Sequence, residues 1–188
     1  MKIVGIVGSP RKGGNSEILL DRLLEGASGI KEKGKLYLNS LNFTPCQECE
    51  DVRKDGICKI DDDFQLIYKK VMESDIIIIS SPVFFGSLPA QVKMMIDRFH
   101  CLWLAKFLFK TVKDEKGKTG IFICVEATRR RDFFENARSI VKNFFVTVGA
   151  SYRYELLCEG IERKGEVKEY PECLEEAYNI GKNLLKWI

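Results

Sequence analysis

Apolar runs alternate with helix-like stretches along the whole chain, and this alternation restricts the fold more than any other feature. Strands are expected over Lys2 to Val7, Lys35 to Leu38, Ile76 to Ser80, Thr119 to Val125 and Ser151 to Leu157. Five stretches are expected to be helical. One has an apolar face made of Leu19, Leu20, Leu23, Leu24 and Ala27, and the others run from about Asp62 to Ser74, from Pro89 to about Phe109, from Asp132 to Val148, and onward from Pro171. This order is typical of βαβ units, so we expect a parallel sheet with helices on both faces.

The chain length and composition favour one domain over residues 1–188. With 188 residues, 45% hydrophobic and 30% charged, one substantial core is expected, and no repeat or linker interrupts it. The start MKIVGIV does not resemble a signal peptide, and no apolar run approaches the roughly 20 residues that cross a bilayer. A soluble, cytoplasmic protein without a membrane partner is therefore expected.

Charge, histidine and cysteine content narrow the functional classes. The net charge of +3 comes from interleaved basic and acidic residues, which gives no support to nucleic-acid binding. A single histidine, His100, argues against catalytic triads and histidine-rich zinc sites. Seven cysteines in a reducing compartment indicate thiols, metal ligands or redox chemistry more than structural disulfides.

A glycine-rich loop, GSPRKGGNS from Gly8 to Ser16, joins the first expected strand to a helix. The carboxyl ends of parallel strands and the N-termini of helices are where open α/β sheets bind phosphates. Gly13 and Gly14 let the backbone approach an anion. Side chains that could complete the cradle are those of Ser9, Arg11, Asn15 and Ser16.

Two well-known phosphate loops do not match this segment. A Walker A loop needs a lysine where Gly14 stands, and a dinucleotide fingerprint needs a glycine where Pro10 stands. A cradle for a single phosphate group remains. The alternative is a polar turn that binds nothing.

A second loop, SSPVFFGSLPAQVKMMIDRF from Ser80 to Phe99, follows the most apolar strand. Pro82 and Gly86 constrain its path, and Val83, Phe84 and Phe85 place apolar surface at the carboxyl edge of the sheet. A flat heteroaromatic ring could lie on this surface. The alternative is that the phenylalanines pack under the loop.

Together, GSPRKGGNS and SPVFFGSLPAQVKMMIDR closely resemble the NAD(P)H-dependent FMN reductase and iron-sulfur flavoprotein group of flavodoxin-like proteins, over roughly Lys2 to Leu157. The resemblance implies a flavodoxin-like three-layer α/β sandwich whose five-stranded parallel sheet has the order 2-1-3-4-5. It also implies an FMN cofactor. The FMN phosphate would be held by Ser9, Arg11, Gly14, Asn15 and Ser16, and the isoalloxazine by Pro82, Val83, Phe84, Phe85 and Gly86. The family tends to carry tyrosine or tryptophan where Phe84 and Phe85 stand.

The resemblance implies an enzyme that takes hydride from NAD(P)H and passes electrons to a quinone, nitro compound, flavin or other acceptor. The flavin carries this chemistry, so we nominate no catalytic acid or base residue. A non-enzymatic FMN electron carrier is the alternative, although carriers usually have an acidic surface and this chain has a charge of +3. A flavodoxin-like scaffold that binds no flavin is the third.

The resemblance further implies homodimers, or homotetramers built as dimers of dimers, with FMN near the subunit interface. Phe99, Trp103 and Phe107 follow one another at four-residue spacing and could supply such an interface. Core packing explains the same spacing almost as well.

Three cysteines, Cys46, Cys49 and Cys58, lie where iron-sulfur flavoproteins carry their cluster in a C-x2-C-x2-C-x4-7-C pattern. Val52 occupies the third position, which leaves three thiolates where a 4Fe-4S cluster normally takes four. The favoured interpretation is a lost or never-acquired cluster, since each missing ligand weakens the hold. There are two alternatives. One is a cluster completed by a non-cysteine ligand such as Asp51 or Asp55, and the other is a redox-active thiol pair. A zinc site faces the same shortage, and buried thiols are expected at most of Cys101, Cys124, Cys158 and Cys173.

A third loop contains Cys124 and Arg130 at the C-x5-R spacing of cysteine-dependent phosphatases. It has no glycine to wrap an anion, and Glu126 would repel one, so this class is disfavoured. Arg129 and Arg130 lie just before a helix N-terminus, where cations are unfavourable unless an anion is near. We hypothesise that one of them contacts the phosphate of NAD(P)H. A solvated charged turn is the alternative.

Overall fold

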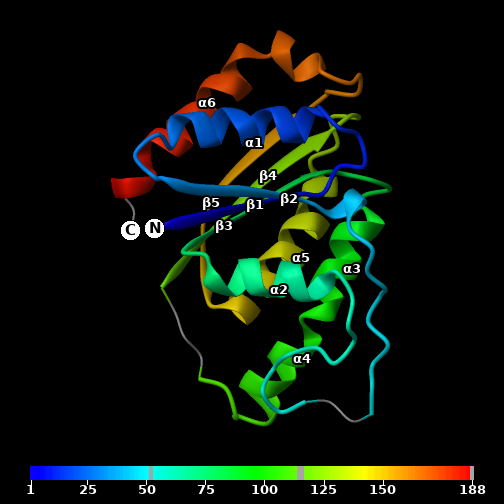
Figure 1. Ribbon diagram of the computed structural model, residues 1–188. Coiled ribbons are helices and arrows are strands. Elements are labelled where there is room, and N and C mark those ends of the chain that lie inside the picture. The colour runs from blue at the N-terminus through cyan, green and yellow to red at the C-terminus, as the bar shows by residue number, and fades with distance from the viewer. Residues whose placement is uncertain (51–52, 114–116, 187–188) are drawn as a thin grey trace.

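The computed structural model describes residues 1–50, 53–113 and 117–186. Five parallel strands form one sheet in the order β2-β1-β3-β4-β5, which confirms the expected order and fold class. Figure 1 shows α1 and α6 on one face of this sheet and α2, α3, α4 and α5 on the other. The arrangement is the three-layer sandwich expected from the alternating pattern.

The elements lie close to their expected positions. The strands are β1 Lys2–Val7, β2 Glu32–Tyr37, β3 Ile76–Pro82, β4 Lys118–Glu126 and β5 Ala150–Glu159. The helices are α1 Asn15–Gly26, α2 Phe64–Glu73, α3 Ala90–Arg98, α4 His100–Trp103, α5 Asp132–Val148 and α6 Pro171–Asn183. Short 3-10 turns cover Leu38–Ser40, Glu166–Glu169 and Leu184–Lys186.

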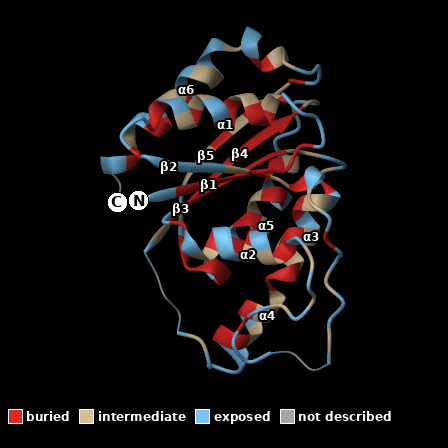
Figure 2. Ribbon diagram, viewed as in Figure 1, coloured by how far each residue is buried: buried red, intermediate tan, exposed pale blue. Residues whose placement is uncertain are grey.

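The core has two halves, one on each face of the sheet. Side chains of β3 alternate between them, with Ile77 and Ile79 facing α2 to α5 and Ile76 and Ile78 facing α1 and α6. Figure 2 shows the central strands buried along their length. This burial on both faces explains why the β3 run is apolar without alternation.

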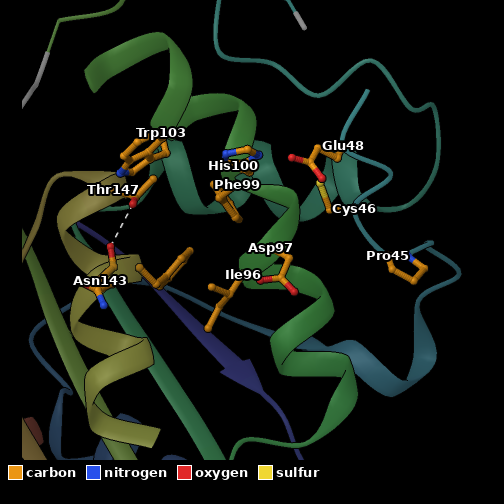
Figure 3. Close-up of a pocket in the computed structure, with 11 residues that line it drawn as sticks. Pro45, Cys46, Glu48, Ile96, Asp97, Phe99, His100, Trp103, Asn143 and Thr147 are labelled. Carbon is orange, nitrogen blue, oxygen red and sulfur yellow. Dashed lines mark hydrogen bonds between the residues drawn. The ribbon is translucent and has the colours of Figure 1, made fainter. Parts of the chain in front are cut away.

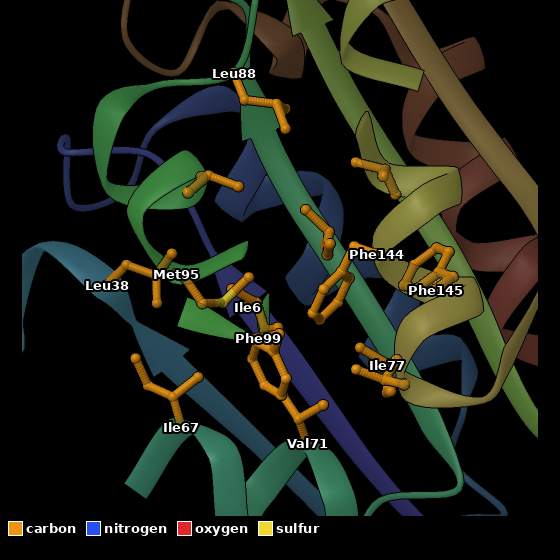
Figure 4. Close-up of a cluster of buried hydrophobic side chains, with 14 of the residues drawn as sticks. Ile6, Leu38, Ile67, Val71, Ile77, Leu88, Met95, Phe99, Phe144 and Phe145 are labelled. Atoms are coloured by element: carbon orange, nitrogen blue, oxygen red, sulfur yellow. The ribbon is translucent and has the colours of Figure 1, made fainter. Parts of the chain in front are cut away.

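Aromatic rings fill much of the half of the core that lies between the sheet and helices α2 to α5. Phe99 lies 5.1 Å from both Phe64 and Phe144, measured between ring centroids, in edge-to-face arrangements. Figure 4 shows Phe99 among Ile67, Val71 and Phe144. Such geometry adds to the stabilisation that burial of the rings already provides.

Two sequence-based boundaries were wrong. The second strand begins at Glu32 instead of Lys35 and ends at Tyr37. Its first half lies on an exposed sheet edge and is charged, so no apolar run marks it. The single helix expected from Pro89 to about Phe109 is divided into α3, α4 and a π-helical turn over Leu104–Leu108.

The division at Phe99 separates the stripe of Phe99, Trp103 and Phe107. Phe99 belongs to the core, whereas Trp103 and Phe107 remain partly exposed with ring centroids 5.9 Å apart. Phe99 is therefore not an interface residue. Within the described ranges, no helix is both long enough and apolar enough to span a membrane.

Candidate functional site

The two predicted loops meet at the carboxyl edge of β1 and β3. The Gly8 N–H donates to the Ser80 carbonyl at 2.8 Å, and the Gln91 side chain of α3 donates to the Gly8 carbonyl at 3.0 Å. They enclose a cavity of about 70 Å³, called the phosphate cavity below. Its lining residues are Ser9, Arg11, Gly14, Asn15, Ser16, Pro82, Val83, Phe84, Val125, Ala127, Ile161, Glu162 and Lys164.

The cradle fits a phosphate group. The Ser16 hydroxyl is buried and has no hydrogen-bond partner, and no other buried side-chain nitrogen or oxygen in the described part of the chain lacks one. A Cβ atom at Gly14 would lie 2.9 Å from both the Ser9 hydroxyl and the Arg11 carbonyl, so only glycine keeps this space open. An unpaired buried hydroxyl costs about 1–3 kcal/mol, and an anion there would supply the missing partner.

Glu17 holds the glycine-rich loop in place. Its carboxylate accepts the Gly13 N–H at 2.7 Å, the Tyr37 hydroxyl at 2.8 Å and the Lys35 ammonium at 3.2 Å. Burial by itself raises the pKa of Glu17, but these three donors outweigh it and hold the pKa below its usual value. The carboxylate is therefore ionised at neutral pH and fixes the loop from behind.

The segment after β5 contributes to the site and was missed by sequence reasoning. The Arg11 guanidinium donates to the Glu162 carbonyl at 3.3 Å, and the Asn15 amide donates to the Arg163 carbonyl at 2.9 Å. The Asn15 amide nitrogen thus ties the glycine-rich loop to the segment after β5. Because all parallel strands end at the same edge, the polar stretch after the fifth strand could have been placed here.

The second loop contributes Pro82, Val83 and Phe84 to the phosphate cavity. Phe84 and Ser87 exchange backbone hydrogen bonds of 2.8 and 3.0 Å, which forms a tight turn. Phe85, at the tip of this turn, has a φ of 49° and is fully exposed, and its side chain is not part of the phosphate-cavity lining. Gly86 does not line it either, and its carbonyl accepts the Asn136 amide at 3.1 Å.

The arginines after β4 lie outside the phosphate cavity. The Arg130 guanidinium pairs with Asp132 at 2.6 Å and lies 4.2 Å from the Phe133 ring centroid. The Arg129 side chain packs on Gly160, where an added Cβ would lie 2.7 Å from its Nε. Both side chains remain on the surface at the same edge of the sheet as the cavity.

The phosphatase alternative is wrong on geometry. Cys124 is completely buried in β4, and burial strongly raises the pKa of its thiol. The Arg130 guanidinium is paired with Asp132 on the surface. A reactive thiolate and an arginine do not meet around one anion in this loop.

The cysteine-bearing loop encloses a second cavity of about 200 Å³, called the cysteine cavity below. It is lined by Cys46, Gln47, Glu48, Cys49, Arg53, Ile57, Cys58, Lys59, Ile60, Arg98, His100, Cys101 and Leu104. Cys101 lies far from the loop in the sequence and is outside its cysteine motif, but α4 places it against the loop. Burial, followed by the charge of Cys58, raises the pKa of Cys101 to about 12.

Arg98 anchors this loop. Its side chain is completely buried, and its guanidinium donates to Asp62 at 2.8 and 3.1 Å and to the Thr44 carbonyl at 2.9 Å. Its Nε donates to the Cys58 sulfur at 3.2 Å. One arginine therefore ties both ends of the loop to α3.

Of the two predicted non-cysteine ligands, Asp55 does not line the cysteine cavity. Asp51, like Val52, lies outside the described residues. Asp55 pairs with Arg53 and accepts the Ile57 N–H at 3.0 Å. In the portions of the chain that the structure describes, no three His, Cys, Asp or Glu side chains are close enough to hold a single metal ion.

A wider groove of about 570 Å³ adjoins the cysteine cavity. Cys46, Glu48 and His100 line both, and the opposite wall of the groove includes Asn143 and Thr147 of α5. Figure 3 shows the Cys46 and Glu48 side chains beside His100. The groove makes this side of the loop accessible from solvent.

Two relatives are iron-sulfur flavoproteins. One from Methanocaldococcus jannaschii is 35% identical over 200 residues, which cover 100% of this chain and 97% of the relative. One from Methanosarcina thermophila is 40% identical over 114 residues, which cover 58% of each chain. This matched stretch therefore spans little more than half of the second relative.

A solved structure has the same fold. The NAD(P)H:quinone oxidoreductase from Methanothermobacter marburgensis superposes with a TM-score of 0.71 over 98% of this chain and 96% of its own, at 19% identity. At that identity the likeness establishes the fold alone. The sequence model of the NADPH-dependent FMN reductases matches residues 1–147, which contain both loops of the phosphate cavity and all four residues Cys46, Cys49, Cys58 and Cys101. The chain therefore belongs to the NADPH-dependent FMN reductase family, a family of FMN-dependent enzymes.

Proposed function

We propose that this protein is an FMN-dependent oxidoreductase that uses NAD(P)H to reduce a quinone, a nitro compound, a flavin or a similar acceptor. The observation that carries the proposal is the buried, unpartnered Ser16 hydroxyl inside a cradle that only Gly14 keeps open. Family membership supports the same cofactor and donor. FMN, when bound, supplies the hydride-accepting chemistry, so the protein itself needs no acid or base residue.

Residues of the first loop hold the phosphate end of the cofactor. A cavity of about 70 Å³ suits a phosphate group and not the ring system. The Ser9 and Ser16 hydroxyls and the Arg11 guanidinium donate to the phosphate, and Gly14 leaves room for its oxygens. Asn15 positions the wall of the cradle through its bond to the Arg163 carbonyl.

Residues of the second loop orient the ring at the mouth of the cavity. Pro82, Val83 and Phe84 line the cavity with apolar surface. Gly86 and the exposed Phe85 follow them in the loop and would contact the part of the ring that extends beyond the cavity. These apolar side chains would exclude water from the ring surface that they contact.

We propose that Arg129 contacts the phosphate of NAD(P)H, with Arg130 beside it. The Arg130 guanidinium already pairs with Asp132, whereas Arg129 extends along Gly160 at the sheet edge. Arg129→Ala should raise the Michaelis constant for NADPH about tenfold, and Arg130→Ala should raise it less. Unchanged Michaelis constants for both NADPH and NADH in both variants would refute the contact.

Purified protein should be tested for FMN and for turnover together. We expect a yellow protein with about one FMN per chain, and steady-state oxidation of NADH or NADPH with ferricyanide or a quinone as acceptor. A protein that binds FMN but does not oxidise either nucleotide would instead be an electron carrier. A colourless protein that FMN does not stabilise thermally would overturn the whole proposal.

We further infer one domain and a cytoplasmic homodimer or homotetramer. Trp103 and Phe107 form a partly exposed aromatic pair of the kind enriched at interfaces. Light scattering should give a multiple of the 21.5 kDa chain mass. Trp103→Ala with Phe107→Ala should shift the protein toward the monomer, and an unaltered mass would exclude this pair from the interface.

A further inference from the structure

Four of the seven cysteines line the cysteine cavity. Cys46, Cys49 and Cys58 come from the loop between β2 and α2, and Cys101 comes from α4. All four are free and partly accessible. The other three lie on different elements, with Cys124 in β4, Cys158 in β5 and Cys173 on α6.

The fold brings Cys101 to the loop through Arg98. The Arg98 Nε donates to the Cys58 sulfur at 3.2 Å, and the Cys101 thiol donates to the Arg98 carbonyl at 3.2 Å. The Arg98 side chain is completely buried and also binds both Thr44 and Asp62. Cys58 and Cys101 are thus held on two sides of one fixed residue, 43 positions apart in the chain.

We propose that Cys101 is the fourth ligand of a 4Fe-4S cluster in the cysteine cavity, together with Cys46, Cys49 and Cys58. A cluster of this type takes four cysteine thiolates, one on each iron. The motif of the loop supplies three, because Val52 stands at the position of the missing cysteine. Exchange with a 4Fe-4S cluster carried by four small-molecule thiolates forms four iron–cysteine bonds and breaks four iron–thiolate bonds. The released thiolates take up the four cysteine protons, so no oxidation state changes.

The shape of the cavity favours a cluster over a single ion. Zinc binds thiolates at about 2.3 Å, which would draw the sulfurs to within about 4 Å of one another. In the described ranges, no three ligand side chains are placed so that they could hold one metal ion. A cluster holds its four cysteine sulfurs farther apart because each binds a different iron, and the cavity that the four cysteines line has a volume of about 200 Å³.

The charge around the cavity also suits a cluster, which is negative once four thiolates bind it. Arg53, Lys59 and Arg98 line the cavity. The hydrogen bond from Arg98 to the Cys58 sulfur is the kind of contact that stabilises a ligating thiolate. Glu48 is the acidic side chain among the lining residues, and it also faces the open groove.

This inference goes beyond the proposed oxidoreductase function, because the cluster can be counted whether or not NAD(P)H is oxidised. The protein should be purified without oxygen, or loaded with a preassembled 4Fe-4S cluster carried by small-molecule thiolates, and assayed for iron, acid-labile sulfide, zinc and FMN. We expect about four irons and four sulfides per chain. Electron paramagnetic resonance of the reduced protein should show the signal of a reduced 4Fe-4S cluster.

Cys101→Ala should lower the iron and sulfide content at least twofold, or leave a three-iron cluster with its own signal in the oxidised protein. Cys101→Ser, which changes a single atom, should shift the signal or the midpoint potential of the cluster. Cys49→Ala should match Cys101→Ala, and Cys173→Ala should retain the wild-type content. FMN content and thermal unfolding of each variant show whether it folds.

The proposal is overturned if folded Cys101→Ala and Cys101→Ser both carry the wild-type iron, sulfide and spectrum, because the fourth ligand would then lie elsewhere. It is also overturned if the wild-type protein takes up zinc in place of iron, or neither metal. None of these results bears on FMN binding, so failure of the cluster and failure of the oxidoreductase proposal are distinguishable.

Discussion

The phosphate cavity and the cysteine cavity are built in different ways. The phosphate cavity lies where two neighbouring parallel strands, β1 and β3, end, and most of its lining comes from two continuous motifs. The cysteine cavity joins a long loop to α4 through the buried side chain of Arg98. One is fixed by backbone topology, and the other depends on side-chain contacts.

The difference has a consequence for stability. A site at the strand ends persists as long as the sheet is intact, because its two loops follow β1 and β3, and each of these strands is hydrogen-bonded to a neighbouring strand on both sides. Among its described residues, the cysteine loop between Ser40 and α2 contains no strand, and Arg98 is its main buried anchor there. The cysteine loop should therefore open under conditions that leave the phosphate cavity in place.

Removal of Arg98 should have the largest effect. Arg98→Met leaves the Asp62 carboxylate, which is only 13% exposed, without its cation. We expect the free energy of unfolding to fall by about 3–5 kcal/mol, measured by urea denaturation. Lys93→Met is the matched control, because it removes an exposed ion pair on the same helix and should cost less than about 1 kcal/mol. If both variants lost the same free energy of unfolding, Arg98 would not be the main anchor of the cysteine loop, and the two cavities would not differ in how they are held.

Acid should weaken the cysteine loop through Asp62. Burial raises the pKa of Asp62, but hydrogen bonds from Arg98 and the Thr44 and Phe64 N–H groups hold the pKa below its usual value. The stabilisation is therefore present above the unfolded value of about 3.9 and is lost as pH falls through the lower folded pKa.

Asp62→Asn should lower stability by about 2 kcal/mol at pH 7 and should flatten its dependence on pH below about 4. Urea midpoints measured from about pH 2 to pH 7 test this. Asp97→Asn, which changes an exposed carboxylate on α3, is the matched control. A slope that is the same in Asp62→Asn and the wild type would show that other groups control the acid transition.

Ser16 should affect the phosphate cavity in two opposite directions. Ser16→Ala removes a buried hydroxyl without a partner, so the flavin-free protein should become more stable by up to about 1 kcal/mol. The same change should weaken FMN binding about tenfold, or about 1.4 kcal/mol, in a fluorescence titration. Ser74→Ala removes a hydroxyl bonded to the Lys70 carbonyl and should not alter FMN affinity. Unaltered FMN affinity in Ser16→Ala would place the phosphate elsewhere.

The smallest effect separates the two phenylalanines of the second loop. Phe84 lines the phosphate cavity and Phe85 does not. Phe84→Ala should weaken FMN binding about threefold, and Phe85→Ala by less than about twofold. A larger loss from Phe85→Ala would mean that this exposed ring folds over the bound flavin.

Much of the phosphate cavity follows from the sequence because its motifs are local. GSPRKGGNS and SPVFFG each follow a strand, and parallel strands deliver such loops to one edge. Ser9, Gly14 and Ser16 could therefore be placed together before any coordinates. The contributions of Glu162 and Lys164 were missed because they follow the fifth strand without a recognisable motif.

The direction of individual side chains could not be predicted. Phe84 and Phe85 are identical in sequence terms, yet a positive φ at Phe85 turns one ring away from the cavity. The break after Arg98 carries no glycine or proline that would mark it. Its position accompanies the burial of Arg98 and Phe99, which depends on residues far away in the chain.

By itself the sequence determined the sheet, its strand order through family resemblance, and most of the flavin loops, because hydrophobic period and turn chemistry act over short distances. Only the tertiary structure decided that Cys101 joins Cys46, Cys49 and Cys58. A spacing motif includes only residues that are near one another in the chain. Cys58 and Cys101 are far apart in the chain, and both are hydrogen-bonded to Arg98 in the folded protein.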